Sequence, residues 1–241
     1  MNNVNIVKIV KKTAQKLFAM NSGINMLKKN EFKLIFPSYS NGIKRVSEQE
    51  LRQCFIEALE NKIYYSVETP TVEKYTFSGK GHISGCADLS LHKKINDEKF
   101  CITSFCEFKA HNVDEKKCTK DFEKLFREKG ENYFIHLLES CDNGTLKALI
   151  NKKYKNGLID VIKKCNENID NKEYNYKVKA KSLNLYIISL NPKFVINKTI
   201  KPKELYSKKL EKVENFEIDY SIINSEFSLK NNNWKKVNYL I

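Results

Sequence analysis

The chain has 241 residues, and its content of 41% hydrophobic and 30% charged residues predicts a soluble globular protein rather than a disordered one. The formal net charge of +14 favours nucleic acid as a partner, but only mildly, because all but three of the 43 cationic residues are lysines and arginine binds phosphate better. The seven cysteines include no C-x-x-C pair, so we expect neither a disulfide framework nor a zinc site, and we expect a cytoplasmic location.

Residues 4–20 have apolar side chains at a helical spacing and predict an amphipathic helix. Lysines interrupt these apolar residues, so the segment lacks the hydrophobic region of a signal peptide. No run along the chain approaches the roughly 18 apolar residues that a membrane-spanning helix needs, so we expect no membrane as a partner.

A second helix is predicted to begin at Ser47, because Ser47-x-x-Glu50 has the form of a capping box and an apolar face follows as far as Leu59. Three strands are expected next, over residues 63–68, 86–92 and 100–110, with a turn at Asn96-Asp97 between the last two. The remaining predicted elements are helices over 119–138 and 144–165, a buried strand over 183–190, and short strands over 216–223 and 234–241. This order predicts the α/β class, with a helix, three strands, a helix and a strand as its main part.

A Glu-x-Lys tripeptide occurs four times in the chain, so its context has to select among the copies. Only Glu107-Phe108-Lys109 closes a long apolar strand, and only this copy follows a strand that contains an acid, Asp88. In an antiparallel hairpin the numbers of directly paired residues have a constant sum, and pairing Asp88 with Glu107 puts the midpoint at about 97.5. That position coincides with the turn that was predicted independently at Asn96-Asp97.

Paired strand residues have Cβ atoms roughly 4.5–5.5 Å apart, so the carboxylates of Asp88 and Glu107 can share one divalent ion. Glu107 and Lys109 are two residues apart and leave the same face of their strand, whereas Phe108 points the other way, into the core. Two hard oxygen ligands with open positions beside them are typical of Mg²⁺ or Mn²⁺ sites. The alternative is a structural role, with Glu107 and Lys109 forming a buried ion pair and Asp88 standing at a strand end.

Asp88, within Gly85-Cys86-Ala87-Asp88-Leu89, and Glu107-Phe108-Lys109 together resemble the PD-(D/E)xK nuclease superfamily. Ala87 stands where that family usually has proline. The resemblance covers roughly residues 46–190 and implies a restriction-endonuclease-like core: a helix, a three-stranded antiparallel meander, a helix and a strand, in a mixed central sheet flanked by helices. We therefore expect one domain over residues 1–241, with a nuclease core (46–190), an N-terminal helical extension (1–45) and a lysine-rich C-terminal appendage (193–241).

The resemblance also implies roles for individual residues. Asp88 and Glu107 would ligate Mg²⁺ or Mn²⁺ with help from the backbone carbonyl of Phe108, and Lys109 would position or polarise the attacking water and offset charge on the phosphate. The implied reaction is phosphodiester hydrolysis of DNA, by an endonuclease rather than an exonuclease, in bacterial defence or DNA processing.

Members of this family often add a glutamate from the first core helix to the metal site. Glu48 matches this place best, since it lies at the start of the predicted helix. Glu50 is the second choice, but its part in the capping box already explains it. Glu57 is a third choice on the exposed side of the helix, and for all three a purely structural role stays open.

Three further residues near the motif are candidates for contact with the nucleic-acid backbone, namely His111, Lys120 and Lys124. The alternative for the two lysines is a solvated helix face with pairs at i,i+4 spacing, and for the histidine it is simple exposure to water. His82 and His92 have no ligand-like spacing and receive no role.

Three other functions stay open alongside the nuclease. The chain can be a catalytically silent nucleic-acid-binding module that keeps the fold, or a nuclease subunit that needs a partner protein or a second protomer. It can also be an interaction protein in which the motif occurs by chance. RNA remains an alternative substrate, and a homodimer is favoured if both strands of a duplex are cut.

Overall fold

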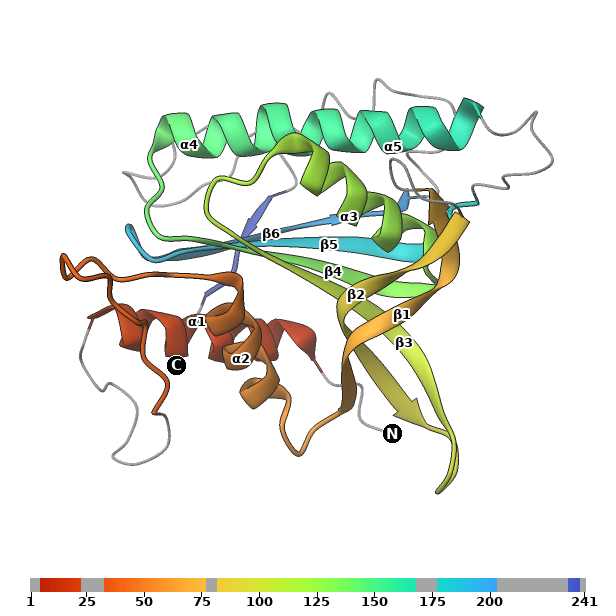
Figure 1. Cartoon of the computed structure of the whole chain (residues 1–241), viewed down its shortest axis with the longest axis horizontal. Helices are drawn as coiled ribbons and strands as arrows, with labels where there is room; N and C mark the ends of the chain where they lie inside the picture. The colour runs from red at the N-terminus through yellow and green to blue at the C-terminus, as the bar shows by residue number, and fades with distance from the viewer. Residues whose placement is uncertain (1–4, 23–32, 77–81, 168–176, 203–233, 239–241) are drawn as a thin grey trace.

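The computed structural model describes residues 5–22, 33–76, 82–167, 177–202 and 234–238. These residues form a sheet of seven strands with helices on both faces (Figure 1), so the predicted α/β class with a mixed central sheet is confirmed. Among the described helices, none combines the length and the hydropathy that a membrane span requires.

The strands follow one another across the sheet in the order of the sequence. Neighbouring strands are antiparallel except at β4, which runs parallel to both β3 and β5. The strands are β1 (Tyr64–Thr76), β2 (His82–Lys94), β3 (Phe100–Ala110), β4 (Gly130–Leu138), β5 (Ala180–Ser189), β6 (Phe194–Ile200) and β7 (Lys235–Lys236).

Two helical layers cover the sheet (Figure 1). The layer on one face consists of α1 (Ile6–Ser22) and α2 (Glu48–Leu59). The layer on the other face consists of α3 (Glu115–Arg127) and a continuous helical stretch made of α4 (Asn143–Lys147), the π-helix η1 (Ala148–Tyr154) and α5 (Lys155–Glu167). The core is therefore divided into two apolar clusters, one on each side of the sheet.

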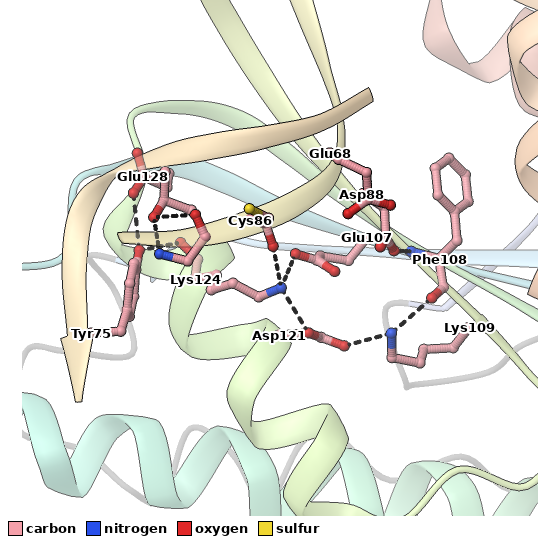
Figure 2. A network of polar contacts seen from close by, with 12 residues as sticks. Glu68, Tyr75, Cys86, Asp88, Glu107, Phe108, Lys109, Asp121, Lys124 and Glu128 are labelled. Carbon is pink, nitrogen blue, oxygen red and sulfur yellow. Dashed lines mark hydrogen bonds and ion pairs between the residues drawn. The ribbon is translucent and has the colours of Figure 1, made fainter. Parts of the chain in front are cut away.

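The alternation of side chains along β3 places the polar residues of the Glu-x-Lys tripeptide opposite its phenylalanine. Phe108 belongs to the cluster under α1 and α2, where its ring contacts Phe55 edge-on with 5.3 Å between centroids. Glu107 and Lys109 leave the strand on the other side, toward α3 (Figure 2), as a period of two requires.

The two N-terminal helices and the hairpin turn confirm the sequence predictions. Ser47 caps α2, since its hydroxyl accepts a hydrogen bond from the backbone N–H of Gln49 at 3.3 Å and contacts the carboxylate of Glu50. The turn between β2 and β3 is closed by the backbone groups of Asn96 and Lys99. β1 and β2 are longer than predicted, and β3 has the predicted bounds.

The single helix predicted over residues 119–138 is wrong, because α3 ends at Arg127 and a central strand, β4, begins at Gly130. The backbone of Gly130 has φ of +116°, and a Cβ atom there would lie 2.0 Å from the carbonyl oxygen of Thr103. The chain therefore enters β4 through a turn that only glycine permits. The run from Tyr133 to Leu138 is buried throughout and apolar except for His136, and such a run does not distinguish helix from buried strand by its periodicity.

Residues 194–200, at the beginning of the predicted C-terminal appendage, form β6 and pair with β5 in the central sheet. Phe194, Val195 and Ile196 are buried, which the lysine-rich appearance of this region conceals. The predicted strand over 216–223 lies outside the described residues. Of the predicted strand over 234–241, the described part contains the two-residue strand β7.

Candidate active site

The site lies where β2 and β3 separate. The pairs Leu89↔Cys106, Ser90↔Phe105 and Leu91↔Ser104 have the same register that pairing Asp88 with Glu107 requires. β2 is paired with β1 on both sides of Leu89, whereas β3 pairs with β4 from Cys106 onward. The carboxylates of Asp88 and Glu107 thus stand at the point of divergence.

Asp88 bridges the two diverging strands. Its Oδ2 accepts a hydrogen bond from the backbone N–H of Phe108 at 2.7 Å, which fixes the carboxylate beside the Glu-x-Lys tripeptide (Figure 2). This contact replaces the next pair of the β2–β3 ladder. Beyond this point β2 and β3 are no longer paired, and a side chain from α3, Lys124, contacts both strands.

Lys109 is nearly buried, with 9% of its surface exposed, and its ammonium has three oxygen neighbours. Nζ lies 2.8 Å from Oδ2 of Asp121, 2.8 Å from the carbonyl oxygen of Phe108 and 4.0 Å from Oε2 of Glu48. Burial works to lower the pKa of Lys109, but attraction to Asp121 and to the other carboxylates outweighs it and raises the pKa. Lys109 therefore keeps its positive charge.

Lys124 reaches the same place from α3 and is only 5% exposed. Its ammonium contacts Oε1 of Glu107, and it lies 3.0 Å from the carbonyl oxygen of Cys86 and 3.1 Å from Oδ1 of Asp121. The interpretation of Lys124 as part of a solvated helix face is wrong, because α3 packs this side chain against the sheet. Lys120, one turn earlier, is exposed.

Glu107 is 1% exposed, so the environment of its carboxylate decides its charge. Burial raises its pKa well above the ordinary value, repulsion from Asp121 and Asp88 adds to the rise, and attraction to Lys124 opposes it. The ammonium of Lys124 is thus the group that favours an ionised Glu107.

Asp121 joins the two lysines, and the sequence analysis did not single it out. Its Oδ2 contacts Lys109 and its Oδ1 contacts Lys124 (Figure 2). The signal that can find it is helical spacing: Asp121 lies one turn after Cys118 and one turn before Leu125, on the face that α3 buries. A carboxylate on a buried helical face requires a cationic partner.

Glu68 is a second acid that the sequence analysis missed. The pairs Val67↔Leu89 and Thr69↔Ala87 place it across the β1–β2 ladder from Asp88, and Figure 2 shows both carboxyl groups at the same end of the site. Its backbone has φ of +46°, and its carboxylate lies 2.6 Å from Nη1 of Arg52. Arg52 therefore neutralises Glu68 from the surface of α2.

Of the three glutamates considered on α2, the structure brings Glu48 to the site. Burial is the main cause that raises the pKa of Glu48, and attraction to Lys109 opposes it. Glu50 pairs with Arg45 at 3.3 Å in addition to its contact at the helix start, and Glu57 pairs with Lys16 on α1. Neither of these two faces the tripeptide.

His111 follows β3 directly, and its backbone lies in the left-handed region with φ of +61°. Its Nε2 contacts the carbonyl oxygen of Val46, just before α2. This contact ties the end of β3 to the loop that leads to Ser47, so it gives His111 a structural task in positioning α2 over the site.

The oxygen donors suit a divalent ion in type. Asp88, Glu107 and the carbonyl of Phe108 are hard donors, and Mg²⁺ commonly binds one or two carboxylates while it keeps several waters. Among the described residues no three His, Cys, Asp or Glu side chains come together as a metal cluster, so waters would complete the coordination. Four carboxylates against two ammonium groups leave two negative charges at the site when Asp88, Glu107, Asp121, Glu48, Lys109 and Lys124 are all ionised.

No family model matches this chain, and neither a curated protein nor a solved structure matches it. The geometry and the charges of the site itself therefore carry the functional inference.

Proposed function

We propose that this chain hydrolyses phosphodiester bonds in DNA with the help of Mg²⁺ or Mn²⁺, as a nuclease of the PD-(D/E)xK type with a restriction-endonuclease-like core. The observation that carries the proposal is the meeting of Asp88, Glu107 and Lys109 where β2 and β3 diverge. The order α2, β1, β2, β3, α3, β4 supports it, since it is the order that the resemblance implies. The net charge of +14 supports a polyanionic substrate.

The residues divide the work by their chemistry. Asp88, Glu107 and the carbonyl oxygen of Phe108 would hold the ion. A bound divalent ion supplies Lewis acidity, which lowers the pKa of water and stabilises negative charge on phosphate. Lys109 stays protonated, orients the attacking water and offsets charge on the phosphate, while Asp121 keeps its ammonium in place.

The proposal is tested by incubating supercoiled plasmid with the purified protein in Mg²⁺ and in EDTA. Nicking or linearisation is expected in Mg²⁺ alone, and Asp88→Ala and Lys109→Ala should abolish it. Glu115→Ala and Lys117→Ala are matched controls, because they change another Glu-x-Lys tripeptide that lies outside the site at the start of α3. Equal cutting by all variants would show that the cleavage comes from elsewhere.

A second candidate is a nucleic-acid-binding module that is silent by itself or acts only with a partner protein. The observation that favours it is that Lys124 already contacts Glu107 and Lys109 already bonds to the carbonyl of Phe108, so two of the oxygen donors are engaged. Retention of DNA binding in a gel-shift assay, without cleavage of duplex DNA, single-stranded DNA or RNA, would favour this candidate over the nuclease.

A further inference from the structure

The ammonium of Lys124 stands in a complete oxygen environment. An ammonium group has three N–H donors, and three oxygens from three different elements surround this one. They are the carbonyl of Cys86 on β2, the carboxylate of Glu107 on β3 and the carboxylate of Asp121 on α3 (Figure 2). Each of the three N–H donors of Lys124 therefore has an oxygen partner within the protein.

One of these oxygens belongs to the proposed metal site. Glu107 is the more buried of the two proposed carboxylate ligands, and its Oε1 is in contact with Lys124. A divalent ion bound to the same carboxylate would stand close to the ammonium, and two cations at that distance in a poorly hydrated site repel each other strongly. Contact of Glu107 with Lys124 and binding of a divalent ion to Glu107 therefore oppose each other.

The other two contacts of Lys124 do not involve the metal donors. Oδ1 of Asp121 and the carbonyl of Cys86 lie 3.1 Å and 3.0 Å from its Nζ, and neither is a proposed ligand. They allow the ammonium to leave Glu107 without becoming an unpaired buried charge.

We propose that Lys124 is an internal cation that competes with the divalent ion for Glu107. This inference rests on the proposed metal site. Without metal, Lys124 neutralises Glu107 and keeps the site folded. When metal binds, Lys124 gives up its contact with Glu107 and keeps those with Asp121 and the Cys86 carbonyl, so the metal affinity is lower than the carboxylates alone would give.

The test is the binding of Mn²⁺, measured from the electron paramagnetic resonance signal of the free ion. At about pH 8.5 few protons compete for the carboxylate. Lys124→Met, which keeps the length of the stem and removes the charge, should lower the dissociation constant about ten-fold, within the usual range of coupling between two sites. Lys117→Met, an exposed lysine on the same helix, should leave it unchanged, and Glu107→Gln should abolish binding.

A second measurement uses the wild-type protein and does not depend on the folding of Lys124→Met. The nitrogen-15 resonance of the Lys124 ammonium, identified by its loss in Lys124→Arg, should shift on titration with Mg²⁺. The resonance of Lys117 should stay in place. An unchanged Lys124 resonance at saturating Mg²⁺ overturns the inference.

The outcomes separate this inference from the proposed function. If Glu107→Gln abolishes Mn²⁺ binding and Lys124→Met binds no more tightly than wild type, the competition is refuted while the metal site stands. If neither wild type nor Lys124→Met binds Mn²⁺, both the metal site and the competition are refuted. Binding by Lys124→Met at concentrations where wild type binds little supports the competition.

Discussion

Oδ2 of Asp121 lies 2.8 Å from Nζ of Lys109, so the lysine of the Glu-x-Lys tripeptide is held by a carboxylate from a different element, α3. The other oxygen of Asp121 lies 3.1 Å from Nζ of Lys124. A single carboxylate thus fixes the spacing between the two ammonium groups of the site. This makes Asp121 a positioning residue for the proposed reaction, because it acts through Lys109.

Asp121→Asn should lower kcat for plasmid or oligonucleotide cleavage by about 10- to 100-fold, the usual effect of removing a residue that orients a metal-site group. KM should change little, because the contact positions Lys109 and does not bind DNA. The measurement is a steady-state assay with a fluorescent duplex, and Asp121→Glu should restore part of kcat. Asp114→Asn is the matched control on the same helix, since asparagine caps a helix as well as aspartate. Equal kcat values for Asp121→Asn and Asp114→Asn would refute the role.

Glu48→Gln should lower kcat less than Asp121→Asn, by about five-fold or less, because Glu48 is half-exposed and its carboxylate lies 4.0 Å from the ammonium of Lys109, so the pair contributes little energy. The same fluorescent assay measures it. Glu57→Gln changes the glutamate that faces α1 on the same helix and should leave kcat unaltered. A loss as large as that of Asp88→Ala would instead assign Glu48 to the metal ligands.

The register of the β2–β3 hairpin was predictable to within one residue because hairpin pairing is local. The turn at Asn96-Asp97 places the two strands opposite each other, but the pairing shifts by one residue between Leu91 and His92, and the turn alone does not give this irregularity. The capped start of α2 is local in the same sense, since Ser47 and Glu50 lie within one helical turn. The hairpin pairing brings Asp88 close to Glu107, and the capped start of α2 places Glu48 at the site.

The parts that could not be predicted depend on tertiary packing. Lys124 is one of many lysines, and only the packing of α3 against the diverging strands shows that its ammonium is buried beside Glu107. Lys198 makes the same point for β6: it is buried in the sheet, where burial lowers its pKa to about 8, although its neighbourhood appears polar in the sequence. The close approach of Gly130 to Thr103 is likewise invisible without the fold.

Gly130→Ala should destabilise the protein by on the order of 3 kcal/mol, because alanine is strained at φ of +116° and its Cβ would overlap the carbonyl oxygen of Thr103. Urea unfolding followed by circular dichroism measures the change. Gly144→Ala is the control, since a Cβ there meets its nearest neighbour, Oδ1 of Asp142, at an ordinary 3.5 Å. Similar unfolding midpoints for the two variants would contradict this account of how β4 begins.

His136 makes the stability of the fold depend on pH. It is completely buried, its Nε2 lies 2.5 Å from the carbonyl oxygen of His111, and its Nδ1 lies 2.6 Å from the hydroxyl of Tyr154. A carbonyl can only accept, so Nε2 carries a proton, and in the neutral ring Nδ1 accepts from the hydroxyl of Tyr154. Burial lowers the pKa of His136 to about 3, with smaller contributions from the nearby Lys109, His111 and Lys153, although the bond to the His111 carbonyl opposes the shift.

Because the folded-state pKa is lowered, the stability that neutral His136 permits is present above the unfolded pKa of about 6.5 and is lost as the pH falls toward the folded value. Between about pH 7 and pH 5 the unfolded chain takes up a proton that the folded protein rejects, and the free energy of unfolding should fall by about 2 kcal/mol. Urea unfolding at both pH values measures the loss. His136→Gln has no titrating ring, so its free energy of unfolding should not show the part of the fall that comes from His136. Carboxylates that titrate near pH 5 affect the wild type and the variant alike. If the two proteins lose equal stability, His136 is not the group responsible.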